Sequence, residues 1–129
     1  MRRISNLFKA VSDCTRLRIL WMLRARPLCV SEIRHVLQLA VSTVSQHLSI
    51  LQNAGLIVDT KDGKWVNYCR NDDPQAERVQ AVLKLIDQWM EQDSQAKKDF
   101  NEAAKADRNQ ICGVQIQPPA SKFTAKEIV

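Results

Sequence analysis

The fold of this chain is decided by residues 31–70, which read SEIRHVLQLAVSTVSQHLSILQNAGLIVDTKDGKWVNYCR. Residues 31–39 are predicted to form a short helix, and residues 42–55 a second, longer helix. Two runs rich in β-branched and aromatic residues follow at 57–61 and 64–70. The stretch therefore predicts two helices that are followed at once by a β-hairpin.

The second helix has one apolar face. Val44, Leu48 and Leu51 recur at i, i+4 and i+7, so they share a face that we expect to be buried. Ser42 is the predicted N-cap, and Gly55 is the predicted left-handed residue just after the last turn.

The opposite face of the same helix is polar but uncharged. No residue between Val41 and Leu56 carries a formal charge. Hydroxyl and amide groups can donate to and accept from base edges in the major groove, and an uncharged face is not repelled by phosphate. The alternative is a surface helix that merely lacks charge. The side chains of this face are Thr43, Ser45, Gln46, His47, Ser49 and Asn53.

The hairpin favours the DNA-binding interpretation. Asp62-Gly63 between two β-prone runs predicts a two-residue type I′ turn. Lys61 and Lys64 lie on either side of that turn, where they can contact phosphate. A helix-turn-helix followed by a basic-tipped hairpin is typical of a winged helix-turn-helix.

An ordered set of motifs carries a family resemblance. The motifs are FKAVSD at 8–13, TRL at 15–17, LCVSEI at 28–33, VSQHL at 44–48, Leu51, AGL at 54–56, DGKWV at 62–66 and Tyr68. In this order they resemble the ArsR/SmtB family of bacterial repressors. The resemblance covers half of the chain and implies a mainly α winged helix-turn-helix of about five helices and a two-stranded wing.

The expected DNA contacts follow from side-chain chemistry and, for Ser45 and His47, from the family resemblance. We expect Gln46 to pair with a base, because its amide can bond adenine bidentately. The lysines of the wing are expected to touch the DNA backbone, and Arg16 and Arg34 are weaker phosphate candidates. The full set of expected contacts is Ser42, Thr43, Ser45, Gln46, His47, Lys61 and Lys64.

The C-terminal third predicts a dimerisation helix. From Gln75 to Arg108 there is no Gly or Pro, and an apolar stripe runs along the segment, interrupted at Asp93. Family members are expected to dimerise through their first and last helices, which matches a palindromic operator. The alternative is that the stripe packs within its own chain. The expected interface residues are Leu7, Val79, Val82, Ile86 and Trp89.

Residues 1–108 are predicted to form the winged helix-turn-helix domain, and residues 109–129 a flexible tail. Within the domain we expect a first helix at 4–11. A second helix should begin after a cap at Ser12 or Asp13 and end at Pro27. Residues 1–40 carry eight Lys or Arg and two Asp or Glu, a net charge of +6 against +5 for the whole chain, which suits phosphate contact.

Four scattered cysteines are the candidates for sensing a signal. In the arsenite-responsive branch of the family the segment 28–34 carries three cysteines, of which only Cys29 is present here. The zinc-responsive branch uses histidines on the last helix, and this chain has none there. A thiophilic metalloid or metal such as As(III) is the expected effector. Its candidate ligands are Cys14, where the dipole of the first helical turn favours thiolate, then Cys112, then Cys29.

Two alternatives to metalloid sensing remain open at the sequence level. The cysteines can be ordinary buried or surface residues, with Cys69 the least suited as a ligand. Two of them can instead form a redox or sulfur-species switch. No cofactor is expected to be required.

Other classes of protein fit the sequence less well. There is no clustered acid–base set, no Gly-rich phosphate loop and no nucleophile motif, so we do not expect an enzyme. A pure interaction module that uses the same fold is the remaining alternative. No apolar run is long enough for a membrane span, and the N-terminus lacks a signal-peptide core, so a cytoplasmic protein is expected.

Overall fold

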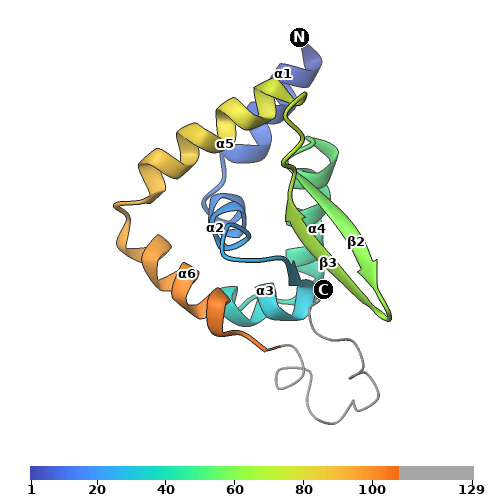
Figure 1. Cartoon of the computed structure of the whole chain (residues 1–129), viewed down its shortest axis with the longest axis vertical. Helices are drawn as coiled ribbons and strands as arrows, with labels where there is room; N and C mark the ends of the chain where they lie inside the picture. Colours follow the sequence, from blue (N-terminus) through green and yellow to red (C-terminus); the bar gives the residue numbers. More distant parts are fainter. Residues whose placement is uncertain (108–129) are drawn as a thin grey trace.

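A computed structural model describes residues 1–107 of the 129-residue chain; the predicted tail of residues 109–129 lies outside the described residues. The described part contains six helices and a three-stranded sheet (Figure 1). In chain order the elements are α1 (Arg2–Val11), α2 (Cys14–Met22), β1 (Leu28–Cys29), α3 (Val30–Leu37), α4 (Val41–Asn53), β2 (Ile57–Asp62), β3 (Trp65–Arg70), α5 (Glu77–Met90) and α6 (Ser94–Lys105). The predicted mainly α fold with a β-hairpin wing is confirmed. Among the described helices none has the length and apolar character that a membrane crossing requires.

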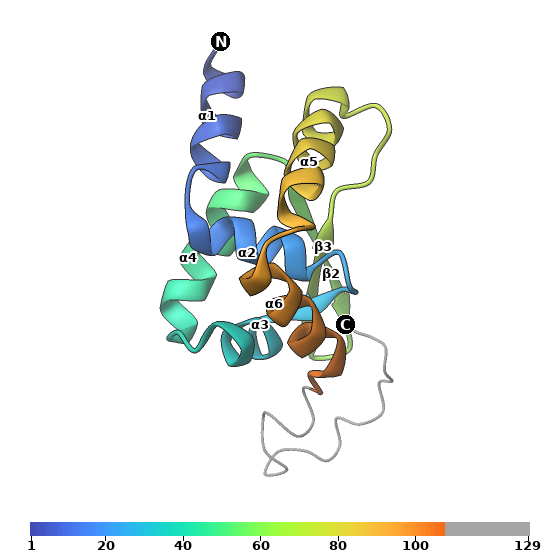
Figure 2. The ribbon, with the colours of Figure 1, turned by 90° about the vertical axis from the view of Figure 1, so that its left-hand side faces the viewer.

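Helix α2 lies at the centre of the molecule, with the other helices around it (Figures 1 and 2). Ile19, Leu20 and Met22 on this helix have no exposed surface. The helices of the helix-turn-helix and the strand that follows bury their apolar faces in the same core. Their fully or nearly fully buried side chains are Ile33, Val44, Leu48, Leu51, Leu56 and Ile57.

Helix α2 begins where the sequence predicted but ends earlier. Asp13, one of the two expected caps, is the N-cap, and its Oδ2 accepts a hydrogen bond of 3.0 Å from the backbone N–H of Arg16. The helix ends at Met22, so the prediction that it continues to Pro27 was wrong. Residues 23–26 form a turn that leads into β1.

The turn of the helix-turn-helix is made by residues 38–40. Gln38 is left-handed, with φ of 59° and ψ of 44°, and its side-chain amide donates to the carbonyl of His35. The predicted N-cap Ser42 was wrong: Ala40 occupies that position in extended conformation, without a side-chain cap, and Ser42 lies inside the first turn. The left-handed residue turns the chain sharply enough for α4 to begin earlier than predicted.

A short third strand was missed at the sequence level. The sheet order is β1-β3-β2, and β1 pairs antiparallel with β3 so that Leu28 lies opposite Tyr68. Two residues are too few to show an alternating pattern, so only the pairing partner reveals this strand. Strand β1 anchors the inner end of the hairpin to the helical core.

The hairpin turn differs from the predicted one by one position. Asp62 pairs with Trp65, so Gly63 and Lys64 are the two turn residues. Gly63 has φ of 66°, whereas Lys64 does not have a positive φ. A type I′ turn needs positive φ at both central residues, so that prediction was wrong.

The C-terminal segment forms two helices rather than the single long helix that we predicted. The chain turns after α5, and Asp93 begins α6 as its N-cap, accepting a 2.9 Å hydrogen bond from the backbone N–H of Ala96. Helix α6 then folds back onto α2 and α3 (Figure 2). Ala96 and Ala103 have no exposed surface, because they pack inside the same chain.

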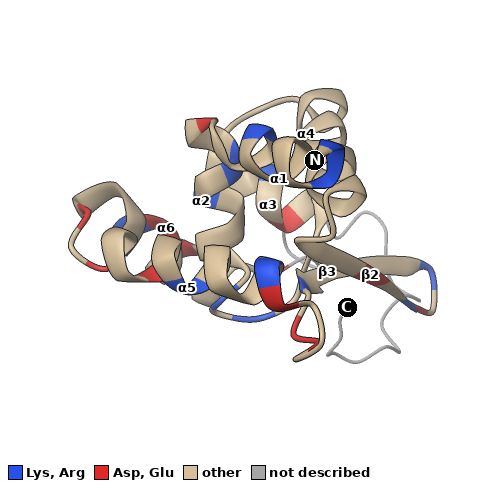
Figure 3. Cartoon of the chain, turned by 90° about the horizontal axis from the view of Figure 1, so that it is seen from above, with Lys and Arg blue, Asp and Glu red and all other residues tan. Residues whose placement is uncertain are grey.

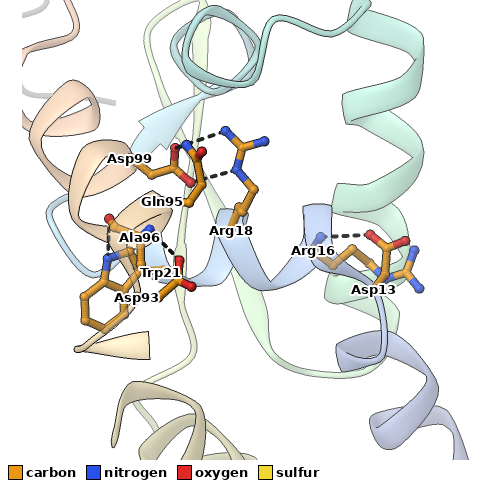
Figure 4. Close-up of polar contacts among 8 residues, drawn as sticks. All are labelled: Asp13, Arg16, Arg18, Trp21, Asp93, Gln95, Ala96 and Asp99. Carbon is orange, nitrogen blue, oxygen red and sulfur yellow. Dashed lines mark hydrogen bonds and ion pairs between the residues drawn. The ribbon is translucent and has the colours of Figure 1, made fainter. Parts of the chain in front are cut away.

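Polar contacts join α6 to α2 (Figure 4). Asp99 has a 2% exposed side chain and forms two bonds with the Arg18 guanidinium, of 2.7 Å from Nε and 3.0 Å from Nη2. Because Asp99 accepts these hydrogen bonds, the pKa of Arg18 is raised above its ordinary value, although burial acts in the opposite direction. Trp21 Nε1 donates a 2.8 Å bond to the carbonyl of Ala96. Arg18, whose side chain is 29% exposed, therefore joins α2 to the buried Asp99 of α6.

Candidate nucleic-acid interface

Helix α4 has the two faces that its sequence predicts. Val44, Leu48 and Leu51 are at most 1% exposed and lie against the core. Gly55 follows the helix with φ of 81°, which confirms the predicted left-handed residue. The expected contact residues Ser42, Ser45 and Gln46 are exposed, as are Ser49 and Asn53. An uncharged surface of hydroxyls and amides is thus presented to solvent.

Two of the expected contact residues lie at the border of the exposed face. Thr43 is half-buried. The His47 side chain is 18% exposed, and its Nδ1 lies 3.1 Å from Nη1 of Arg16 and 4.0 Å from Oδ2 of Asp13. His47 is therefore held by α2 and its cap, and not on the open face beside Gln46.

Arg16 was a weak candidate for phosphate contact, and the structure uses its side chain internally. Nε donates a 2.7 Å hydrogen bond to the carbonyl of Ala10, and Nη2 donates to the carbonyl of Lys9 at 3.2 Å. Arg34 is exposed, and its Nε donates to the carbonyl of Leu39 in the helix-turn-helix turn. Asp13 was one of two predicted caps of α2, but no local pattern predicted the contact between Arg16 and His47, which lie 31 positions apart.

The wing carries two lysines near its tip, with Asp59 and Asp62 on the same hairpin. Figure 3 shows the hairpin projecting from the helical body, with basic residues at its tip. Lys61 and Lys64 are both exposed, the first near the end of β2 and the second in the turn. An exposed cation on a projecting turn can reach a phosphate backbone.

The structure places the expected dimer residues in three environments. Leu7 and Ile86 are 5% and 7% exposed, so their own chain already covers them. Val79 and Val82 are partly buried against the core, whereas Trp89 is 71% exposed. Further exposed apolar side chains, which we had not singled out, lie on the same two helices. They are Ile4 and Phe8 on α1 and Leu85 on α5.

The three cysteines within residues 1–107 lie in different surroundings. Cys14 is exposed at the start of α2. Cys29 is 3% exposed, and burial together with the charge of Glu32 raises its pKa to about 12. Burial, with a contribution from Asp72, also raises the pKa of the half-buried Cys69. Within residues 1–107 no three His, Cys, Asp or Glu side chains are grouped to hold a metal ion. Cys112 lies outside the described residues.

These features define a class of protein. A helix-turn-helix with an exposed, uncharged polar helix, followed directly by a hairpin with lysines at its tip, is the winged-helix arrangement of DNA-binding regulators.

Comparison with known proteins identifies the family. The pattern described as "Bacterial regulatory protein, arsR family" matches residues 13–58, which contain α2, α3 and α4. An HTH-type transcriptional regulator of Methanocaldococcus jannaschii is 38% identical over 87 residues, covering 67% of this chain and 93% of that protein. The arsenic resistance transcriptional regulator ArsR1 of Pseudomonas putida is 37% identical over 93 residues, covering 68% of this chain and 72% of that protein.

Solved structures agree with the sequence comparison. HlyU from Vibrio cholerae superposes with a TM-score of 0.59 at 32% identity, covering 68% of this chain and 91% of that one. The chain belongs to the arsR family of bacterial regulatory proteins, whose members are winged-helix, DNA-binding transcriptional regulators and not enzymes.

Proposed function

We propose that this protein is a homodimeric transcriptional repressor that binds a palindromic operator in the cytoplasm and releases it when a thiol-binding ligand arrives. The observation that carries the DNA-binding part is the exposed face of α4. Ser42, Ser45 and Gln46 lie on that face with no charged residue nearby on the helix, and the lysines of the wing lie on the next element. The neutral polar residues of α4 suit contact with base edges, and the lysines of the wing suit contact with the DNA backbone.

The proposed dimer uses the apolar surface that the single chain leaves exposed. Phe8 on α1 is 58% exposed and Trp89 on α5 is 71% exposed, and Ile4 and Leu85 extend the two patches. An open cavity of about 530 Å³ lies between α1, the end of α4 and the start of α5. Large exposed aromatics at helix surfaces are typical of interfaces. A two-fold axis relating two α4 helices would match the two halves of a palindrome.

The proposed effector is a thiophilic metalloid such as As(III), or a similar metal. Support comes from the exposed thiol of Cys14 and from the similarity to ArsR1 of P. putida, which is named for arsenic resistance. Cys112 is the second proposed ligand. Cys29 is the third, and its burial means that it can bind only after α3 or β1 moves. An effector releases DNA if it binds the DNA-free conformation more tightly.

A redox signal is the second candidate. An exposed thiol at Cys14 is open to oxidants as well as to metalloids, and no three-ligand cluster is assembled within residues 1–107. In that case Cys14 and Cys112 would form a disulfide or polysulfide link. DNA binding would be the same in both cases.

The DNA-binding part is tested by operator selection and fluorescence anisotropy. Duplexes are selected from a random pool with the wild-type dimer, and the selected palindrome is titrated with variants. Gln46→Ala is expected to lose about 1–3 kcal/mol of binding free energy and to relax the base preference at one position in each half-site. Gln88→Ala, an exposed glutamine on α5, is the matched control and should bind as wild type. Wild-type affinity in Gln46→Ala would remove α4 from the groove.

The effector part is tested on the same palindrome. Arsenite is added under anaerobic conditions, and peroxide is added to a separate sample. Release by arsenite that is abolished in Cys14→Ser or Cys112→Ser supports metalloid sensing. Release by peroxide alone supports the redox candidate and contradicts the metalloid. Cys69→Ser serves as the control cysteine, because its pKa is raised by burial and it lies in the wing strand.

A further inference from the structure

The guanidinium of Arg16 joins three helices at one point. The carbonyls of Lys9 and Ala10, at the end of α1, both accept hydrogen bonds from it, at 3.2 Å from Nη2 and 2.7 Å from Nε. Its remaining nitrogen, Nη1, lies 3.1 Å from Nδ1 of His47 on α4. Arg16 itself belongs to the first turn of α2, where its backbone N–H donates to Asp13 (Figure 4).

We propose that Arg16 is a positioning residue for DNA binding: it fixes the recognition helix α4 against the end of the dimer helix α1 by donating a hydrogen bond to His47. This inference rests on the proposed function of α4. It assigns to Arg16 a role that differs from phosphate contact, because all three guanidinium nitrogens have partners inside the protein.

The chemistry of the contact determines the state of His47. A guanidinium has only donors, so Nδ1 of His47 must be the acceptor and must carry no proton. The ring is then neutral, and its single proton is on Nε2, on the side of the ring away from Arg16.

The other contacts of Arg16 explain why an arginine is needed for this task. The last carbonyls of a helix attract cations. The carbonyl of Lys9 also accepts from the backbone N–H of Ser12 at 3.3 Å and from its Oγ at 3.2 Å, so Arg16 is an additional donor there. A planar fork can satisfy two of these carbonyls and still direct a third donor elsewhere, which a lysine ammonium cannot do in one fixed geometry. A displacement of the end of α1 would thus move the donor that holds α4.

A double-mutant cycle on the selected palindrome tests the coupling. In the wild-type background His47→Ala is expected to weaken operator binding about tenfold, the factor that corresponds to one lost hydrogen bond of ordinary strength. In the Arg16→Gln background the same His47→Ala change should have almost no further effect, because the contact is already absent. In the Lys9→Gln background, which loses a nearby exposed charge instead, the full tenfold effect should remain. Equal effects of His47→Ala in the Arg16→Gln and Lys9→Gln backgrounds would overturn the inference.

A conservative variant provides a second test that leaves Arg16 in place, in case Arg16→Gln does not fold. The side-chain oxygen of His47→Asn lies near the position of Nδ1 and can accept the same hydrogen bond. We expect its affinity to lie within about threefold of wild type, well above that of His47→Ala. If His47→Asn and His47→Ala bind equally weakly, the Arg16 contact does not position the helix.

Nitrogen-15 NMR of the free protein tests the tautomer without DNA. The chain has two histidines, so His35→Gln assigns the remaining signal to His47. At about pH 8, above the ordinary titration range of histidine, Nδ1 should be unprotonated and Nε2 protonated. A proton on Nδ1 would contradict the inference even if the protein binds its operator. Failure of wild type to select any palindrome, with the expected tautomer present, would instead contradict the proposed function.

Discussion

The ion pair between Arg18 and Asp99 holds α6 against α2, and its contribution to the free energy of unfolding can be measured by substitution. Asp99 is 2% exposed, and Arg18 supplies two of its hydrogen bonds, while Gln95 Nε2 supplies another at 2.9 Å. The substitution Arg18→Met keeps most of the apolar stem and removes the charge. Asp99 would then remain in the interior with a single neutral donor.

The cost follows from the burial of each partner. Removing one partner of a buried ion pair costs about 3–5 kcal/mol, because the other charge is left uncompensated. Since the Arg18 side chain is 29% exposed, water can reach part of the vacated site, and we expect about 3 kcal/mol. The double variant Arg18→Met with Asp99→Leu removes both charges. It should recover most of this loss, to within about 1 kcal/mol of wild type.

Urea denaturation at pH 7, followed by circular dichroism, measures these differences as shifts of the unfolding midpoint. Lys98→Met is the matched control, since it removes an exposed positive charge from α6 itself and should change stability by less than about 0.5 kcal/mol. A loss below about 1 kcal/mol in Arg18→Met, or a double variant no more stable than the single one, would refute the argument from burial.

Four further outcomes are expected. Native Cys29 should react with iodoacetamide far more slowly than Cys14 at neutral pH, because its pKa is raised to about 12 by burial; mass spectrometry after brief labelling checks this. Because the pKa of Cys29 is higher in the folded protein, its contribution to stability is fully present below about pH 9 and is lost as the pH rises toward 12. Wild type should therefore lose more stability than Cys29→Ala between about pH 9 and 12 in parallel urea titrations. Gly55→Ala should cost about 1 kcal/mol in the same assay, since the site has room for the methyl group and only the φ of 81° opposes it. Lys64→Ala should weaken binding to all duplexes alike and reduce the salt slope by about one; an unchanged slope would place Lys64 away from phosphate.

Local sequence signals were sufficient for the elements that carry the DNA-facing surface. The apolar spacing of Val44, Leu48 and Leu51 predicted the buried face of α4, and thus also its exposed face, because a helix has a fixed period. Asp13 was one of the two predicted caps, and Asp62-Gly63 placed the hairpin to within one residue. Each of these features depends on neighbours that are only a few positions apart in the chain.

The C-terminal half shows where such signals fail. An apolar stripe that resumes in the same frame after Asp93 predicted one long helix, but Asp93 caps a new helix, and α6 packs against α2. Periodicity shows that a face is buried without showing what buries it. The same spacing placed Leu7 and Ile86 on apolar faces, and in the single chain they are 5% and 7% exposed.

By itself, the sequence determined the helix-turn-helix, the wing and the neutral polar face of α4, since these follow from backbone preferences and short-range spacing. Only the tertiary structure decided the fold-back of α6, the burial of Cys29 and the partners of Arg16 and Arg18. Those partners are 31 and 81 positions away in the chain. A contact between such distant residues depends on the packing of whole helices, which no local pattern encodes.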